Sequence, residues 1–202
     1  MSGQDQNDLL TLIAPTEKRR KGLIGEFEEH LSEGAVMLAY ALHVLRTSDA
    51  QKVEIHPDGE HGKRFEFRSR LLARGFQFVS PLGTTEYGGL YRHVDGREIE
   101  VYPRSGLGDV VAVVGNGRIV AETKGGIVNT RHPGPTSRLR RGLCEAVGLL
   151  LATPLVEGTQ QIAVVPNVDV TQRLAKSMIT RVRRAGIKIS LVDLCGNVTD
   201  VT

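Results

Sequence analysis

The sequence is poor in the residues that dominate several classes of binding protein. It has no tryptophan, and all aromatic residues together make up 4% of the chain, so a platform of aromatic side chains for stacking bases is not expected. The two cysteines, Cys144 and Cys195, form no CxxC pair. This argues against a disulfide framework or a structural zinc site, and it favours a reducing compartment.

Long apolar runs are also missing. None approaches the about 18 residues that a membrane-spanning helix needs. The N-terminal stretch MSGQDQNDLL lacks the basic start and the apolar core of a signal peptide. We therefore expect a cytoplasmic protein that does not enter a membrane.

The composition is that of an ordinary globular chain with unevenly placed charge. Its 202 residues, 40% hydrophobic and 24% charged, suit one domain over 1–202 with a helical and hairpin elaboration over about residues 1–75. The net charge is only +3, but acids collect in stretches such as EFEEHLSE, away from the basic residues. This separation is typical of a protein that presents one positive face to a polyanion. The basic segments are 18–21, 63–74, 131–141 and 173–188.

The first half of the chain mixes helical and strand patterns. Apolar residues at helical spacing predict one long helix over 23–45, with a stripe of Leu23, Phe27, Leu31, Leu38, Leu42 and Leu45. The alternating segment KVEIHPDGEHGKRFEF, residues 52–67, predicts a hairpin with a long loop. A short helix over 69–74 should end at Gly75. Further strands are predicted over 76–79, 89–93 and 98–102.

The second half gives the fold class. The stretch DVVAVVGNGRIVAETKGG, residues 109–126, reads as two strands joined by a turn, and a helix from Ser137 to Ala152 follows it. A strand at QQIAVVPN, a basic helix over 171–185 and a strand at IKISLVD then predict a parallel, right-handed unit. We expect an α/β fold in which helices flank a mixed sheet, with an antiparallel hairpin core and a parallel β-α-β extension.

Three charged residues at one end of the hairpin need an explanation. A two-residue turn at Asn116-Gly117 pairs Asp109 with Lys124, and a turn at Gly115-Asn116 pairs Asp109 with Glu122. Side chains alternate with period two and paired residues share a face, so either register places Asp109, Glu122 and Lys124 on one side of the sheet.

Two carboxylates and an ammonium on one face suit phosphodiester chemistry. Carboxylate oxygens are the ligands that Mg²⁺ or Mn²⁺ prefers, and such a metal lowers the pKa of bound water. The adjacent ammonium can orient that water or stabilise charge on phosphorus. The residues therefore indicate a metal-dependent phosphodiester hydrolase.

With these residues the chain resembles the PD-(D/E)xK nuclease superfamily, which has the restriction-endonuclease-like fold. Gly108-Asp109 takes the place of the first acid, and Glu122 to Lys124, ETK, is the only (D/E)xK match in the chain. The helix and strand that follow come in the order of that family. Gly108 departs from the family by replacing the usual proline. The resemblance implies an Mg²⁺- or Mn²⁺-dependent nuclease that acts on DNA, with Asp109 and Glu122 as metal ligands and Lys124 as the catalytic lysine.

The resemblance also implies a further acid from the first helix. Glu26 and Glu28 lie on either side of the apolar stripe, and periodicity does not choose between them. Glu66 is a third candidate if the segment around it is the relevant helix. The loop HPDGEH gathers four more residues that could bind a metal or contact a substrate, although a polar turn is the commoner use of such a loop: His56, Asp58, Glu60 and His61.

Contacts to DNA are expected from the basic segment before and within the helix that follows the hairpin. Arginines and helix N-termini both suit phosphates. An alternative from another class is an inactive nucleic-acid-binding or scaffold module of the same fold within a defence or repair complex, and the resemblance is compatible with a homodimer or a subunit of a larger assembly. The candidate contact residues are Arg131, His132, Arg138, Arg140 and Arg141.

Overall fold

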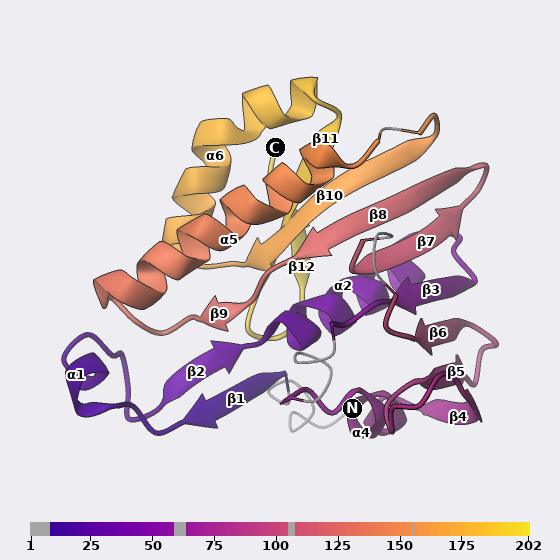
Figure 1. Cartoon of the computed structure of the whole chain (residues 1–202), viewed down its shortest axis with the longest axis horizontal. Coiled ribbons are helices and arrows are strands. Elements are labelled where there is room, and N and C mark those ends of the chain that lie inside the picture. The colour runs from indigo at the N-terminus through magenta and orange to yellow at the C-terminus, as the bar shows by residue number, and fades with distance from the viewer. Residues whose placement is uncertain (1–8, 59–63, 105–107, 155) are drawn as a thin grey trace.

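The computed structural model describes residues 9–58, 64–104, 108–154 and 156–202 and shows an α/β architecture (Figure 1). These residues form one nine-stranded mixed sheet, helices on both of its faces, and a separate three-stranded sheet. No helix in these ranges is long and apolar enough to cross a membrane. The predicted mixed sheet flanked by helices is confirmed at this level.

The large sheet changes from antiparallel to parallel pairing at β8. Its strand order is β12-β11-β10-β8-β7-β3-β6-β5-β4. Strand β8 pairs antiparallel with β7 and parallel with β10, and β10 pairs parallel with β11. The strands are β3 (Lys52–Ile55), β4 (Phe76–Pro81), β5 (Gly89–His93), β6 (Glu98–Val101), β7 (Val110–Val114), β8 (Gly117–Thr123), β10 (Thr159–Pro166), β11 (Ile187–Val192) and β12 (Val198–Asp200).

The helices cover opposite faces of this sheet. Successive residues of a strand point to opposite faces. On β8, Ala121 packs in the same apolar cluster as the residues of α2, whereas Val120 packs in the cluster of α5 and α6. Helix α2 therefore lies on one face, and α5 and α6 lie on the other (Figure 1). The helices are α2 (Glu33–Thr47), α4 (Phe67–Ala73), α5 (Pro133–Ala152) and α6 (Asp169–Arg184).

A small sheet continues from the end of β8. It has the order β1-β2-β9, with β1 (Leu10–Ile13), β2 (Glu28–Leu31) and β9 (Gly126–Ile127). The one-turn helix α1 (Glu17–Arg20) lies between β1 and β2 and projects at the left of Figure 1. Because β9 begins shortly after β8 ends, the small sheet is joined directly to the strand that carries the candidate site.

The predicted long helix over 23–45 is wrong in its first part. Residues Glu28–Leu31 form β2, paired with β1 and β9, and the helix begins only at Glu33. The chain turns at Gly25, whose φ is 106°, and the Ser32 hydroxyl caps the helix by accepting a bond from the Ala35 N–H at 3.2 Å. The apolar residues before Ser32 follow a helical spacing by coincidence, and long-range strand pairing decides their conformation.

The predicted hairpin over 52–67 is also wrong. Strand β3 pairs in parallel with β6 and antiparallel with β7, and the residues from Phe67 onward enter α4. Residues 59–63 lie outside the described ranges. Alternation predicted a strand correctly at Lys52–Ile55, but its partners lie more than 40 residues away along the chain. Local pattern carries no information about such partners.

The other local predictions are confirmed. Helix α4 ends just before Gly75, whose φ is 83°, and β4, β5 and β6 lie within a few residues of their expected bounds. The unit β10-α6-β11 is parallel as expected. Helix α5 begins at Pro133, four residues earlier than predicted, because the His132 side chain caps it by accepting a bond from the Gly134 N–H at 3.3 Å.

Candidate active site

The hairpin turn selects one of the two predicted registers. Val114 pairs with Gly117, so the turn residues are Gly115 and Asn116, and the φ of Gly115 is 54°. The strand ladder continues to the pair Val110–Ala121. Beyond this pair the Asp109 N–H donates to the Ala121 carbonyl at 2.9 Å, and Asp109 and Glu122 line the same cleft.

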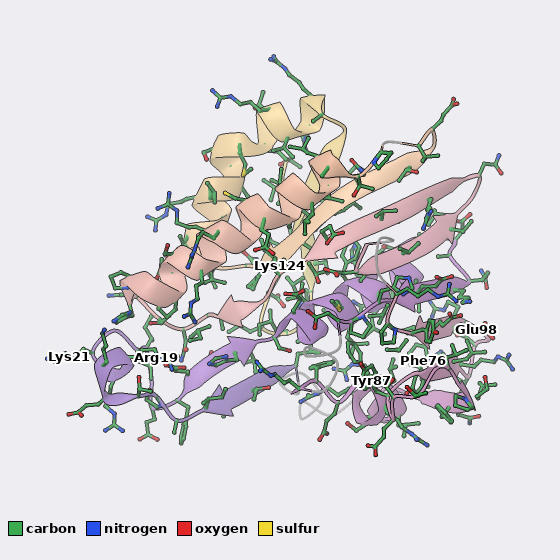
Figure 2. All side chains as sticks on the ribbon, viewed as in Figure 1. Arg19, Lys21, Phe76, Tyr87, Glu98 and Lys124 are labelled. Carbon is green, nitrogen blue, oxygen red and sulfur yellow. The ribbon has the colours of Figure 1, made fainter. Side chains whose placement is uncertain are left out.

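The three charged residues of the hairpin end line one cleft. The cleft has a volume of about 670 Å³ and lies where the end of β8 meets α5, the start of α2 and the loop after β3. Figure 2 shows Lys124 near the centre of the molecule, below α5. The titratable residues of the lining are Glu33, His56, Asp58, Arg104, Asp109, Glu122 and Lys124.

Asp109 is held by hydrogen bonds from two neighbouring segments. Its Oδ2 accepts bonds from the Thr123 amide at 2.7 Å and from the Thr123 hydroxyl at 2.9 Å. Its main-chain N–H donates to the Ala121 carbonyl at 2.9 Å, and its carbonyl accepts from the His56 N–H at 2.8 Å. The carboxylate is therefore positioned by backbone geometry on both sides.

Glu122 is a carboxyl whose ionisation is disfavoured. Partial burial raises its pKa to about 7, and the negative charge of Asp109 adds to the rise, as do Glu33 and Glu145, while Lys124 opposes it. Near neutral pH this group is poised between its two protonation states. Such a shifted carboxyl in a cleft is typical of a site where a cation or a proton is exchanged.

Lys124 is surrounded by acids. Its ammonium lies 3.1 Å from the Glu33 carboxylate and 3.6 Å from that of Glu145, and its stem passes close to Gly142 of α5. Burial acts to lower the pKa of Lys124, but the carboxylates of Glu33 and Asp109 outweigh it, and the net direction is upward. The side chain is therefore a cation under all ordinary conditions, with its charge held inside the cleft.

Glu33 is the acid that the sequence analysis missed. It is the first residue of α2, and its side chain is only 11% exposed. Its carboxylate lies beside Lys124 because the backbone at the start of α2 contacts the backbone of Gly125. A Cβ at Gly125 would lie 2.4 Å from the Glu33 nitrogen and 2.5 Å from the Leu31 carbonyl oxygen. The Ser32 cap, which marks the true helix start, was the signal in the sequence that could have placed Glu33 in the first turn of α2, although not beside Lys124.

The three acids proposed for this role do not line the cleft. Glu26 is exposed in the segment before β2. Glu28 is buried in the small sheet, where it pairs with Arg19 at 2.9 Å and His30 at 3.1 Å. Glu66 is exposed at the start of α4 and accepts a bond from Ser69. The choice between Glu26 and Glu28 depended on the helix over 23–45, which does not exist in that form.

The loop after β3 contributes to the cleft. His56 and Asp58 line it, and the His56 side chain is fully buried. Its Nδ1 lies 2.7 Å from the Tyr102 carbonyl oxygen, and its Nε2 has no hydrogen bond, with the Glu54 carboxylate 3.5 Å away. Glu60 and His61 lie outside the described residues. Arg104, which the sequence analysis did not select, adds an exposed cation to the rim.

The donor set fits a hard divalent cation held by two carboxylates. Mg²⁺ and Mn²⁺ take oxygen ligands, and Mg²⁺ usually keeps several waters. The part of the pKa rise of Glu122 that comes from Asp109 reflects a repulsion that a bound cation would relieve. Within the described ranges, no group of three or more His, Cys, Asp or Glu side chains is arranged to hold a metal ion. Asp109 and Glu122 would hold such a cation as a pair, with water as its other ligands.

The four candidate DNA-binding arginines are exposed around the start of α5: Arg131, Arg138, Arg140 and Arg141. Arg138 and Arg141 precede Glu145 by seven and four residues, which is the spacing of one helix face. Because Glu145 contacts Lys124, this face leads to the cleft. Arg140 lies about 140° around the helix from Glu145 and faces elsewhere. His132 serves as the helix cap.

The conformation of Gly108 excludes proline, the usual residue at this place in the motif that the segment resembles. Its φ is 90°, which proline cannot adopt, and a Cβ there would lie 2.7 Å from Val120 Cγ1 and 3.7 Å from Glu122 Oε1. Glycine therefore lets the chain before β7 pass directly under the Glu122 carboxylate.

We expect Gly108→Ala to destabilise the protein more than Gly96→Ala. Gly96 has the same φ of 90°, but no atom lies within 4 Å of the place that a Cβ would take, so its substitution isolates the backbone cost. That cost is about 1 to 2 kcal/mol, and crowding at Gly108 should add about 1 to 3 kcal/mol. Urea denaturation of both variants measures the difference. Equal destabilisation would mean that the backbone at Gly108 moves freely away from Val120.

Comparisons with known proteins gave no match. No family model matches the sequence, and no curated protein and no solved structure is significantly similar to it. The functional assignment therefore depends on the geometry of the site.

Proposed function

We propose that this protein is a metal-dependent nuclease of the PD-(D/E)xK superfamily, with a restriction-endonuclease-like fold, that hydrolyses phosphodiester bonds in DNA. The observation that carries the proposal is the convergence of Asp109, Glu122 and Lys124 in one cleft at the end of a β-hairpin. The parallel strand β10 beside β8, and α5 between them in sequence, agree with the order of elements in that superfamily.

Each residue of the cleft has a chemical role in this proposal. Asp109 and Glu122 would hold Mg²⁺ or Mn²⁺, which would supply a water of lowered pKa and polarise the phosphate. Lys124 places a permanent positive charge beside the reacting phosphate and stabilises the negative charge that develops there. Glu33 and Glu145 position the Lys124 ammonium through their ion pairs. Arg104 at the rim is placed to contact a neighbouring phosphate.

The partner in this proposal is DNA, bound through its phosphates. Arg138 and Arg141 extend the charged surface from the cleft along α5, and within the described residues neither makes an ion pair. Their guanidinium groups are thus available to phosphates without breaking an internal contact. The proposal includes a cytoplasmic location and either a homodimer or a place in a larger complex.

Among the α5 arginines, only those on the cleft face should affect the salt dependence of DNA binding. Removing one side chain that contacts a phosphate lowers the slope of log K against log salt by about 0.9. We expect Arg138→Ala and Arg141→Ala each to lower the slope by about this amount and Arg140→Ala to leave it unchanged. Fluorescence anisotropy in EDTA at several salt concentrations measures the slopes. Equal effects of all three substitutions would show that DNA does not contact the cleft face of α5 in preference to the other faces.

A second candidate is an inactive nucleic-acid-binding or scaffold module of the same fold. The observation that favours it is the ion pair between Lys124 and Glu33, which gives the lysine a structural partner. In that case the acids and Lys124 stabilise the end of β8, and another subunit of a defence or repair complex performs the chemistry.

Cleavage assays distinguish the two candidates. Purified protein is incubated with plasmid, linear duplex and single-stranded DNA in Mg²⁺, Mn²⁺ or EDTA. The nuclease proposal requires cleavage that depends on the metal. Metal-independent DNA binding without cleavage of any substrate would support the binding module instead.

A further inference from the structure

The segment 16–27, which we call the basic finger, is a charged surface outside the cleft. It contains α1 and projects beyond the start of α5; Figure 2 shows Lys21 at the far left of the molecule, well away from Lys124. Its side chains Lys18, Arg20 and Lys21 are exposed. Four basic residues stand against two acids, Glu17 and Glu26, so the finger is positive overall.

The finger is fixed to the chain that enters α5. The Ile24 N–H donates to the Asn129 carbonyl at 2.9 Å, and the Arg131 N–H donates to the Gly22 carbonyl at 2.7 Å. The Asn129 side-chain amide donates to the carbonyls of Ile24 and Phe27, both at 2.8 Å. These bonds place the finger directly beside Arg131 and the first turn of α5.

One basic residue of the finger is used internally and the others are not. Arg19 pairs with the buried Glu28 at 2.9 Å and donates to the Thr16 hydroxyl at 3.2 Å, which ties α1 to the small sheet. In the part of the chain that the structure describes, Lys18, Arg20, Lys21 and Arg131 make no ion pair. An ordered segment that presents unpaired cations suits a polyanion.

The path from the cleft to the finger has the length of a short piece of duplex. Twelve residues of α5 separate Glu145, beside Lys124, from Pro133, a distance of about 18 Å along the helix. A duplex rises 3.4 Å per base pair, so this path corresponds to about 5 base pairs. Arg141 and Arg138 lie on it, and the finger lies beyond its far end.

We infer that the basic finger is a second phosphate-binding surface, which grips the flank of a DNA duplex about 5 to 8 base pairs from the bond in the cleft. The inference rests on the proposed function for the position of the cleaved bond. A competing interpretation is binding to an anionic membrane, because the exposed lysines lie beside exposed apolar residues such as Ile24 and Phe27. The continuity with Arg131 and the α5 arginines favours DNA.

A matched pair of triple variants tests the finger. Lys18→Ala, Arg20→Ala and Lys21→Ala together remove three charges from the finger. Arg173→Ala, Lys176→Ala and Arg184→Ala together remove three exposed charges from α6, which lies on the far side of α5 from α2 (Figure 1). Circular dichroism confirms the fold of each, and Lys21→Glu provides a single substitution if the finger triple does not fold.

The readouts are DNA binding and footprinting in EDTA, where the proposed cleavage does not occur. We expect the finger triple to lower the salt slope by up to about 2.7 and to lose protection at one flank of the footprint only. The α6 triple should keep both the slope and the flank. Equal losses in the two triples, an unchanged finger triple, or a parent that does not bind duplex DNA would each overturn the inference.

Further controls separate the finger from the nuclease proposal and from other polyanions. If the finger triple loses protection of one flank although the parent protein never cleaves DNA, that result would support the finger and contradict the nuclease proposal. A parent that cleaves in Mg²⁺ while its finger triple keeps the full footprint supports the nuclease and contradicts the finger. Finger-dependent binding only to duplex RNA, or only to vesicles containing phosphatidylserine, also overturns the inference.

Discussion

We expect Lys124→Ala and Glu122→Gln each to lower the rate of metal-dependent DNA cleavage by about 10²- to 10³-fold or more. Lys124→Ala removes the cation that stabilises charge on the reacting phosphate. Glu122→Gln keeps the shape of the side chain but removes one of the two carboxylates that hold the metal. Initial rates of plasmid cleavage at saturating Mg²⁺ measure both effects.

Matched controls use exposed residues far from the cleft. Lys176→Ala on α6 and Glu157→Gln in the turn before β10 remove the same charges outside the site. Both should cleave at the rate of the parent. If Lys124→Ala and Glu122→Gln also retain the full rate, the activity comes from a contaminant or from another site, and the nuclease proposal fails.

Saturating Mg²⁺ or Mn²⁺ should raise the melting temperature of the parent protein. A ligand at 100 times its Kd stabilises the folded state by about 2.7 kcal/mol. For a chain of this size that corresponds to about 5 to 10 °C. Asp109→Asn keeps the shape of the side chain and loses one metal-binding charge, so adding metal should change the melting temperature of this variant little. Differential scanning fluorimetry with and without metal gives the comparison.

The stability of the metal-free protein should depend on pH through Glu122. Its pKa of about 7 in the folded protein lies above the ordinary value of 4.5, so the folded state binds the proton more tightly than the unfolded chain. Without metal, the contribution of this group to stability is present below about pH 4.5 and is lost as the pH rises through 7. Glu122→Gln removes that loss.

Metal binding should show the opposite trend. The cation needs the ionised carboxylate, so its affinity should rise about tenfold per pH unit below 7 and level off above it. Isothermal titration calorimetry at several pH values tests the trend. Affinity that is independent of pH between 5 and 8, or an equal thermal shift in Asp109→Asn, would show that the cation binds elsewhere.

Features that depend on local sequence could be predicted. The Gly-Asn-Gly turn, the strands on either side of it and the unit β10-α6-β11 all follow from short-range patterns. Alternation along a strand is also a local property, and it predicted that Asp109, Glu122 and Lys124 lie near one another; all three line one cleft. This is why the convergence of these three residues could be predicted without a structure.

Features that depend on distant partners could not be predicted. Strand β3 pairs with β6 and β7, and β2 pairs with β1 and β9, so the partners of neither strand could be assigned from its neighbours in sequence. Glu33 was missed for the same reason. Its place in the cleft depends on the approach of the α2 start to the end of β8, and no periodicity within either segment encodes that approach.

Gly125 makes the separation of Glu33 and Lys124 a property of the main chain. The backbones on either side of this residue are in contact, so neither segment can move closer to compensate for a change in side-chain length. An acid shorter by one methylene at position 33 would leave a gap to the ammonium that only water could fill. The spacing of the Glu33–Lys124 ion pair therefore depends on Gly125, a residue that has no side chain of its own.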